Sequence, residues 1–437
     1  MNQGRQTISG WGRYPWQDAR VHMPRVCSEF KAALQTNLPL IARGMGRSYG
    51  DSALANTVLQ TTQYDHFISF DPVTGVLSAQ AGITLREILR LVVPAGWFFP
   101  VTPGTSFVTL GGAIASDVHG KNHHKVGTFG QYVIAIQILL GTGDVVVASA
   151  SEHSDLFEAT CGGMGLTGVI LSATFQLIPI RSSRIRQKTL KTTNLEATCQ
   201  AFTEHSDGSY SVAWIDCLAT GKQLGRSVIL LGEHEETSGL ELPLKAPWHV
   251  PVDAPAVLLN GLTMRIFNQV YWSGARAIES KSVAMMPYFY PLDAISGWNK
   301  LYGQSGFLQY QFVLPKTDGI ANMRRVLNRI AASGQGSFLA VLKAFGPANT
   351  HLLSFPMEGY SLALDFKISS AAFELLDLLD DWIVDMGGRI YLSKDALMRE
   401  STFKKTYPRW AEFENVRQRY GAIGSFASVQ SKRLGLQ

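Results

Sequence analysis

The sequence predicts an α+β fold with two domains, one of which has a cavity large enough for a bulky ligand. With 437 residues, the chain is too long for one ordinary hydrophobic core. Up to about residue 180, short β-rich runs alternate with glycine turns. Beyond that point come longer runs typical of an antiparallel sheet, separated by amphipathic helices. The composition, 46% hydrophobic and 17% charged, is that of a well-packed globular protein.

The elements expected in the first 180 residues are short. A helix is predicted over 84–93, where Thr84 and Glu87 have capping-box spacing. A second helix is predicted over 154–163 and ends at a glycine pair. The expected strands are LPLIARG, GVLSAQAG, YVIAIQILLGTGDVVVAS and TGVILSATFQLIPI.

The second part of the chain predicts an antiparallel sheet with helices between its strands. The expected strands are YSVAWID, RSVILLGE, GFLQYQFVLP, SFLAVLKAFG and SLALDFKI. Helices are expected at DGIANMRRVLNRIAAS and AAFELLDLLDDWIVDMGG, because their apolar residues recur at helical spacing. RIYLSKD, near the end of the chain, predicts one more strand.

Charge and cysteine usage exclude several classes of protein. The net charge of +5 comes from scattered Lys and Arg without a basic run, so we expect no nucleic-acid partner. The four cysteines lie far apart without a C-x-x-C pair, which argues against a zinc ribbon or a disulfide framework and favours a reducing compartment. They are Cys27, Cys161, Cys199 and Cys217.

Hydropathy predicts a cytoplasmic protein, and one apolar segment allows two interpretations. The first residues lack the apolar core of a signal peptide, and no uninterrupted apolar stretch reaches the roughly 18 residues of a membrane span. Residues 247–274 collect apolar and aromatic side chains around two prolines. They predict either an irregular cover over a core or a surface that touches lipid or a lipid-linked ligand, which would allow peripheral contact with the inner face of a membrane.

Three glycine-rich elements indicate an extended ligand that carries phosphate. They are ARGMGRSYGDS at 42–52, PGTSFVTLGGAIASDVHGKNHH at 103–124 and CGGMGLTGV at 161–169. Closely spaced glycines let successive N–H groups point into one concavity, which suits a pyrophosphate. The first element alone is equally compatible with a plain tight turn, and it lacks the context of the Rossmann fingerprint. Together they favour a ligand that lies across the first domain.

The histidines that follow the second element allow three interpretations. His119 and His123 are four residues apart, as metal ligands on a helix would be. Gly120 disfavours a helix there, and no third residue of a metal-ligating type lies at a spacing typical of a metal site, so we expect no metal. A polar structural loop and a cofactor or substrate site both remain open from the residues alone.

Four strings carry a resemblance to a known flavoprotein family: GMGRSYGD, VTPGTSFVTLGGAIASDVHGKNHH, GGMGLTGVI and IYLSKD. With them, the chain resembles the vanillyl-alcohol oxidase/p-cresol methylhydroxylase (PCMH) superfamily, and within it most closely the polyprenyl-phosphoryl-ribose oxidases. Further similar strings, such as YSVAWID and LSFPMEGY, extend the resemblance over most of the chain. It implies a PCMH-type FAD-binding domain made of 1–180 and the returning segment 389–437, with 181–388 inserted as an antiparallel-sheet substrate domain.

The resemblance also implies which residues surround FAD. In many superfamily members a histidine in a G-x-G-H-S segment bonds covalently to the flavin, whereas Arg47 stands at that position here. We therefore expect non-covalent FAD. The residues assigned to the cofactor are Ala42, Arg43, Gly44, Met45, Gly46, Arg47, Ser48, Tyr49, Gly50, Asp51, Gly104, Thr109, Leu110, Gly111, Gly112, Ser116, His119, Val169 and Tyr391.

For the reacting end, the resemblance implies FAD-dependent oxidation of a sugar alcohol. Lys394 is the first candidate for orienting or deprotonating the hydroxyl, with His119 and Tyr49 as alternatives. Trp214 has the alternative of a core aromatic, and Lys343 that of a surface lysine. The residues assigned to the substrate are Lys121, Trp214, Gln309, Gln311, Lys343, Phe345 and Lys394.

The implied reaction converts the 2′-hydroxyl of a polyprenyl-phosphoryl-β-D-ribofuranose to the 2′-keto sugar. This is the first half of a ribose-to-arabinose epimerisation that serves the cell envelope, and a separate NAD(P)H-dependent reductase would complete it. Two alternatives remain open. One is an oxidase of a soluble polyol, aldonolactone or free sugar, and the other is a flavin-binding protein without enzymatic activity.

Overall fold

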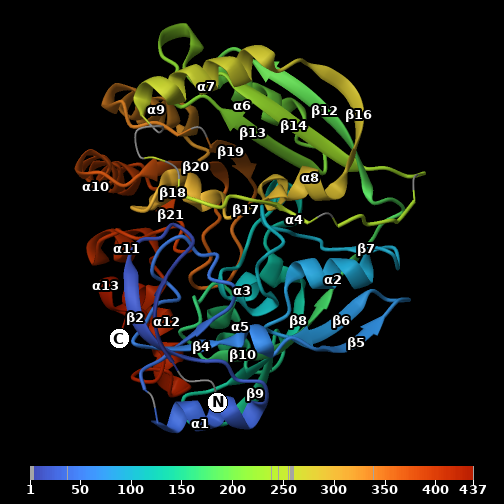
Figure 1. Cartoon of the computed structure of the whole chain (residues 1–437), viewed down its shortest axis with the longest axis vertical. Helices are drawn as coiled ribbons and strands as arrows, with labels where there is room; N and C mark the ends of the chain where they lie inside the picture. The colour runs from blue at the N-terminus through green and yellow to red at the C-terminus, as the bar shows by residue number, and fades with distance from the viewer. Residues whose placement is uncertain are drawn as a thin grey trace.

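Figure 1 shows the computed structural model, in which antiparallel sheets and helices form a mixed α/β fold. It describes residues 4–36, 38–237, 239–244, 246–253, 255, 260–337 and 339–436.

Two sheets built from the first 180 residues occupy the lower half of Figure 1. The four-stranded sheet has the order β1 (Gly4–Ser9), β2 (Trp16–His22), β4 (Thr57–Gln60) and β3 (Ile41–Arg43). The five-stranded sheet is antiparallel, with the order β5 (Phe67–Asp71), β6 (Val76–Gln80), β10 (Val169–Gln176), β8 (Val133–Leu139) and β9 (Val145–Ser149). A two-stranded pair joins β7 (Trp97–Phe98) to β11 (Ile178–Pro179).

An eight-stranded sheet above them contains strands from residue 184 to residue 390 (Figure 1). Its order is β16 (Ile278–Ala284), β12 (Arg184–Thr192), β14 (Ser227–His234), β13 (Tyr210–Ile215), β19 (Ala340–Phe345), β20 (Gly359–Lys367), β18 (Phe307–Pro315) and β21 (Arg389–Ile390). All pairings in this sheet are antiparallel, as the sequence predicts. A short parallel pair joins β15 (Trp248–His249) to β17 (Ile295–Ser296).

The helices flank these sheets, and one of them begins at the cap that the sequence predicts. Thr84 and Glu87 form the predicted capping box at the start of α2 (Leu85–Val92). The predicted helix over 154–163 forms as α5 (Ser154–Thr160). The other helices are α1 (Cys27–Thr36), α3 (Leu110–Ala115), α4 (His123–Val126), α6 (Leu195–Glu204), α7 (Gly261–Gly274), α8 (Met285–Phe289), α9 (Gly319–Ser333), α10 (Ser370–Asp385), α11 (Glu400–Thr406), α12 (Trp410–Arg419) and α13 (Val429–Arg433).

After β21 the chain returns to the lower half of the molecule, where the red C-terminal helices lie beside the blue N-terminal strands (Figure 1). Leu40 forms a parallel bridge with Phe426, and both side chains are fully buried in one cluster with Phe30. Helix α12 packs against α5. The last fifty residues therefore complete the core that the first residues begin.

The prediction of a strand at RIYLSKD is wrong for most of its length. Only Arg389–Ile390 pairs with β18, and the chain then turns, because the N–H groups of Lys394 and Asp395 both donate to the carbonyl of Tyr391. The turn has a functional consequence: it brings Lys394 to the interior of the molecule instead of continuing along the sheet edge.

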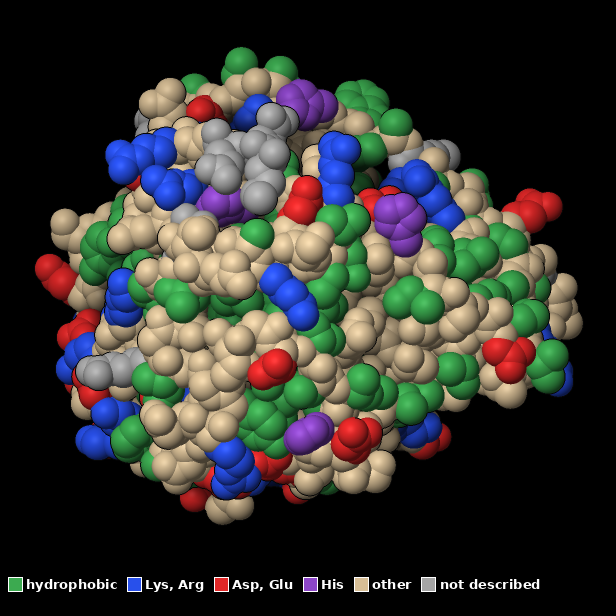
Figure 2. Space-filling model, turned by 90° about the horizontal axis from the view of Figure 1, so that it is seen from below, with side chains coloured by type: hydrophobic (Ala, Val, Ile, Leu, Met, Phe, Trp, Pro, Cys, Tyr) green, Lys and Arg blue, Asp and Glu red, His purple; other side chains and the backbone are tan. Residues whose placement is uncertain are grey.

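Charged side chains of both signs are interspersed with hydrophobic and uncharged ones on the face that Figure 2 shows. This mixture differs from the continuous basic stripe of a nucleic-acid-binding surface. Among the residues that the structure describes, no helix is long and apolar enough to cross a bilayer.

Candidate functional site

A cavity of about 990 Å³ lies between the glycine-rich loops and the eight-stranded sheet. This volume is at the upper end of the range for small-molecule and cofactor sites. One side is formed by residues of 42–49 and 104–119, which we call the glycine wall. The other side, the sheet wall, consists of the cavity-facing side chains of β13, β18, β19 and β20 together with Lys394.

The glycine wall is held in shape by Thr109, whose hydroxyl caps α3 by accepting a hydrogen bond from the N–H of Gly112 at 3.1 Å. Gly44 packs so closely against Thr109 that a side chain at Gly44 would collide with the threonine hydroxyl. Arg43 donates to the carbonyls of Ser9 at 2.7 Å and Ala53 at 3.3 Å. The loop after β3 is therefore fixed by its own side chains, while its backbone faces the cavity.

The glycine wall fits the pyrophosphate-bearing cofactor that the resemblance implies. In the described part of the chain, the N–H groups of Met45, Gly46, Arg47 and Ser48 have no protein acceptor, and all four residues line the cavity. Gly46 has a φ of +63°, a backbone conformation that favours glycine. Successive free N–H groups around such a residue form an anion-binding concavity.

Small residues on the same wall leave room for the rest of a long ligand. A Cβ added to Gly104 would meet no protein atom within 4 Å, so the cavity reaches the backbone there. The third glycine element contributes Gly165, which has a φ of +78°, and Gly168. The three glycine-rich elements that the sequence singles out therefore lie around one cavity.

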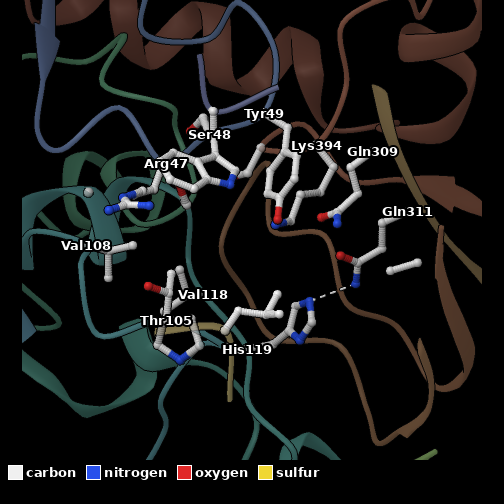
Figure 3. Close-up of a pocket in the computed structure, with 18 of the residues that line it drawn as sticks. Arg47, Ser48, Tyr49, Thr105, Val108, Val118, His119, Gln309, Gln311 and Lys394 are labelled. Carbon is white, nitrogen blue, oxygen red and sulfur yellow. Dashed lines mark hydrogen bonds between the residues drawn. The ribbon is translucent and has the colours of Figure 1, made fainter. Parts of the chain in front are cut away.

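The sheet wall carries buried amides, each with a partner. Gln309 and Gln311 lie on the same face of β18, and Figure 3 shows both directed into the cavity. Gln309 Nε2 donates to Asp365 at 2.6 Å, and Gln311 Nε2 donates to Ser361 at 3.2 Å and to the Nε2 atom of His119 at 3.0 Å. Asp365 and Ser361 both lie on β20, where the strand register pairs Gln309 with Asp365. These hydrogen bonds offset the cost of burying two amides.

Three buried lysines also line the cavity, and all have lowered pKa values. Burial lowers the pKa of Lys394 to about 7, an effect that the Asp365 carboxyl opposes and the Lys343 ammonium increases. Burial lowers the pKa of Lys343 to about 8. Burial, with the charge of Lys343, lowers the pKa of Lys121 to about 7, and its Nζ donates to the carbonyl of Phe289 at 3.1 Å. The cavity is therefore cationic in its interior.

Lys394 lies among the other candidate reactive groups, next to Tyr49 and Gln309 (Figure 3). Its Nζ is 3.9 Å from the centre of the Tyr49 ring. Burial and the charge of Asp365 raise the pKa of Tyr49 well above 10, so this phenol stays protonated at neutral pH. Burial and the charge of Lys343 lower the pKa of His119 well below 6.5, which keeps the imidazole neutral. Its Nε2 lone pair accepts the Gln311 amide hydrogen.

Arg47, which replaces the flavin-linking histidine of many superfamily members, is oriented by aromatic rings. Its guanidinium carbon lies 3.8 Å from the centre of the Trp11 ring and 5.4 Å from that of Phe107. Burial lowers its pKa, whereas the charge of Asp293 opposes that change. A guanidinium in this position donates hydrogen bonds but is not a nucleophile.

Most residues assigned to the site from the sequence lie on the cavity wall. The structure places Ala42, Arg43, Gly44, Met45, Gly46, Arg47, Ser48, Tyr49, Gly104, Thr109, Gly111, Gly112, Ser116, His119, Lys121, Trp214, Gln309, Gln311, Lys343, Tyr391 and Lys394 there. Their roles toward a ligand remain predictions.

Five assigned residues lie outside the described lining of the cavity, and their assignments stay predictions. Asp51 pairs instead with Arg433 at 2.8 Å, and Gly50 packs against the backbone of Asp395, because the chain turns away after Tyr49. Leu110 and Val169 are fully buried in the core, since their neighbours along the helix and the strand take the cavity-facing positions.

Phe345 is the fifth residue, and it supports the wall from behind. Its ring lies 4.7 Å from that of His119 and 4.5 Å from that of His123, in a cluster with Phe355 and Tyr391. It therefore fixes the orientation of the histidine rather than contacting the space in front of it.

Several lining residues were missed from the sequence. Thr105, Gly165 and Gly168 lie inside the glycine-rich strings, so the signal for them was present. Asp365 does not line the cavity but lies fully buried behind Gln309, and the register that pairs the two was not available from the sequence. The other missed lining residues include Trp11, Ser52, Ala53, Thr61, Val108, Val118, Met164, Ile170, Trp298 and Ser393.

The histidine cluster after α3 does not assemble a metal site in the part of the chain that the structure describes. The rings of His119 and His123 are 6.5 Å apart and edge-on. His123 Nδ1 accepts a hydrogen bond from the N–H of Gly346 at 3.2 Å, and His124 Nε2 lies 2.9 Å from the carbonyl of Gly208. His123 and His124 therefore tie the loop to the upper sheet.

Comparison with known proteins adds independent support for this geometry. Residues 22–149 match the family described as FAD binding domain. A protein named decaprenylphosphoryl-beta-D-ribose oxidase from Mycolicibacterium smegmatis is 36% identical over 98% of this chain and 97% of its own length. An uncharacterized protein from the mprA 5′ region of Streptomyces coelicolor is 32% identical over 81% of this chain. Human delta(24)-sterol reductase is 31% identical over only 28% of this chain and 24% of its own length.

Proposed function

The chain belongs to the family of FAD-dependent oxidoreductases that contains decaprenylphosphoryl-beta-D-ribose oxidase, and from this premise we propose its substrate and mechanism. The substrate is a polyprenyl-phosphoryl-β-D-ribofuranose, whose 2′-hydroxyl is oxidised to the 2′-keto sugar. The single observation that carries this proposal is the cavity itself. A backbone-lined wall suited to FAD faces a wall of buried lysines and amides suited to a phosphorylated sugar.

The glycine wall would hold FAD, and the free N–H groups of residues 45–48 would bind its pyrophosphate. When bound, it supplies the acceptor for the hydride that leaves the carbinol carbon. The attachment is non-covalent, because Arg47 occupies the position of the linking histidine and a guanidinium does not form that bond. Residues 181–388 form the inserted substrate domain.

Lys394 takes the hydroxyl proton. Its pKa of about 7 leaves a substantial fraction of the amine neutral at physiological pH, as a general base requires. The two alternatives fit less well: Tyr49 stays protonated, and the Nε2 atom of His119 is already an acceptor for Gln311. Gln309 and Gln311 orient the sugar hydroxyls from one face of β18.

Lys121 and Lys343 bind the substrate phosphate. Both line the cavity and both are buried, so an anion between them relieves the cost of burying two positive charges. A phosphate also raises the pKa of each lysine, which keeps them protonated in the complex. A separate NAD(P)H-dependent reductase then reduces the keto sugar to the arabinose epimer, and the enzyme works at the cytoplasmic face of the membrane.

Anaerobic mixing of the FAD-loaded enzyme with polyprenyl-phosphoryl ribose tests the proposal. We expect bleaching of the oxidised flavin spectrum and formation of one 2′-keto sugar per flavin. Free ribose, a polyol and an aldonolactone are the matched comparison substrates. Persistence of the oxidised spectrum at saturating lipid-linked substrate would refute the proposal. Faster bleaching by a soluble sugar would show that the substrate is a soluble sugar and not a lipid-linked one.

A further inference from the structure

Helix α7 (Gly261–Gly274) presents an apolar face to solvent. Leu262, Ile266 and Val270 follow each other at intervals of four residues, and their exposed fractions are 68%, 55% and 66%. Phe267 and Tyr271 form the adjacent row and are also exposed. Contiguous exposed apolar side chains on a folded protein mark a surface with a partner.

The side of α7 that faces the protein carries both apolar and polar residues: Met264 is buried in the core, and Trp272 donates to the carbonyl of Thr192 at 3.3 Å. Asn268 is fully buried and donates to Asp216 at 2.9 Å, while Arg265 donates to the carbonyl of Leu218 at 3.0 Å. A helix that folds onto a soluble core normally keeps its apolar residues inward, whereas α7 buries only Met264 and Asn268 and leaves Leu262, Ile266 and Val270 exposed. Met264 and the polar contacts therefore hold this helix in place and leave a second apolar row directed outward.

The apolar stripe is continuous with the cavity. Phe267 and Tyr271 both line the cavity and are both exposed, and the Tyr271 ring lies 4.6 Å from that of Trp214 on β13. Figure 1 shows α7 at the end of the molecule opposite the two termini. Any hydrophobic tail on a ligand in the cavity therefore has an apolar path out to this surface.

The surroundings of the stripe are basic. Arg276 and Lys281 follow the helix and are exposed, and Lys281 also lines the cavity. The acidic residue between them, Glu279, is paired with Lys188 at 3.0 Å. Arg276 and Lys281 form no ion pair with any residue that the structure describes, and two such cations beside an apolar stripe complement anionic headgroups above a hydrocarbon layer.

We propose that α7 docks this protein on an anionic lipid bilayer, with the Leu262–Ile266–Val270 row inserted at the interface and the cavity opening toward the lipid. A 14-residue helix is about 21 Å long, shorter than the hydrocarbon core, so it lies in the interface instead of spanning it. The inference deepens the proposed function and rests on it for one step, the exit of the substrate's lipid tail beside Phe267 and Tyr271.

Co-sedimentation of the FAD-loaded protein with vesicles tests the docking surface. The vesicles contain equal parts of phosphatidylglycerol and phosphatidylcholine. The test variant is Leu262→Gln/Ile266→Gln/Val270→Gln, in which glutamine keeps good helix propensity and no substituted residue lines the cavity. The control variant is Ile68→Gln/Val73→Gln, because these residues are similarly exposed and lie on and beside β5 at the other end of the molecule.

We expect the wild-type and control proteins to bind, and the triple variant to bind at least about tenfold more weakly. Equal binding of the triple variant and wild type, or no binding by wild type, would overturn the inference. Light scattering measures the oligomeric state of both proteins. If wild type is a dimer and the triple variant a monomer, a second copy of this chain covers α7, and the inference is overturned.

Reduction of the flavin by a water-soluble, short-chain polyprenyl-phosphoryl ribose without vesicles separates the two proposals. We expect the triple variant to match wild type in this assay, which also shows that it is folded. A protein that binds vesicles through α7 but is not reduced by this substrate would refute the proposed function and leave the docking surface standing. Loss of reduction in the triple variant alone would show that α7 shapes the cavity and would refute docking as its role.

Discussion

The two walls of the cavity recognise ligands in different ways. The glycine wall offers backbone N–H groups and open space, while side chains such as Thr109 and Arg43 are bonded to the protein's own backbone. The sheet wall offers side chains, among them Lys343 and Lys394 with lowered pKa values. A backbone surface suits a ligand that stays and is held by its phosphates, whereas titratable side chains suit a ligand that must react and leave. The following predictions separate the two walls experimentally.

The largest expected effect is at Lys394. Lys394→Met removes the proposed base, so turnover should fall about 100- to 10,000-fold while FAD stays bound. Steady-state kinetics and the visible spectrum measure both. Lys316→Met is the matched control, because Lys316 is an exposed lysine paired on the surface with Glu358. Near-normal turnover in Lys394→Met would move the base to another residue.

Loss of one phosphate-binding cation should act on substrate binding. A charge-assisted hydrogen bond contributes about 1.5–3 kcal/mol, so Lys343→Gln should raise KM about 10- to 100-fold with a smaller change in kcat. Lys405→Gln, at an exposed position, should leave KM unchanged. A fall in kcat at constant KM would assign Lys343 to the chemical step instead.

On the glycine wall, Gly104→Val should weaken FAD binding about tenfold or more without unfolding the protein. The added side chain meets no protein atom within 4 Å of its Cβ and so projects into the cavity. Titration of the cofactor-free protein with FAD measures the affinity. Gly4→Val, which also meets no atom but lies on β1 away from the cavity, should bind FAD normally. Unchanged affinity in Gly104→Val would place FAD elsewhere.

Asp365→Asn should shift the pH dependence of the reaction more than its maximal rate. The Asp365 carboxyl raises the pKa of Lys394, so its removal lowers that pKa further and the rate should begin to rise at lower pH. The asparagine still accepts one hydrogen bond from Gln309. Asp385→Asn on the exposed side of α10 is the control. An unshifted profile would show that Asp365 only positions Gln309.

The smallest expected effect is on stability. Thr109→Ala removes the cap of α3 and should lower the free energy of unfolding of the cofactor-free protein by about 1 kcal/mol in urea. Thr109→Ser keeps the hydroxyl and should recover most of that loss. Equal losses in both variants would assign the effect to the threonine methyl group, which packs against Gly44.

Local patterns in the sequence predicted much of the fold and part of the site. The Thr84–Glu87 capping box and the two-residue spacing of Gln309 and Gln311 depend on residues close together in the chain, and both form as predicted. The turn at Lys394 was not predicted, because β-propensity continues past Ile390. In the folded chain, the hydrogen bonds to the Tyr391 carbonyl form a turn in place of a longer strand.

Contacts between distant segments explain the remaining differences. Asp51 belongs to the glycine-rich string, yet it pairs with Arg433, which is 382 residues away. Trp11 reaches the cavity because its N–H donates to the carbonyl of Ser48, a pairing that no local pattern predicts. The glycines mark where a ligand can approach the backbone, and only the folded chain determines which neighbours share the space.

The pH dependence of the second-order rate constant of flavin reduction, measured at limiting polyprenyl-phosphoryl ribose, tests the central claim, that Lys394 is the base, most directly, because this constant reports the pKa of the free enzyme. Below its pKa the amine carries a proton and accepts none, so the rate constant should be low. It should rise as pH passes through about 7 and then reach a plateau. A rate constant that stays flat or falls across this range would contradict the assignment.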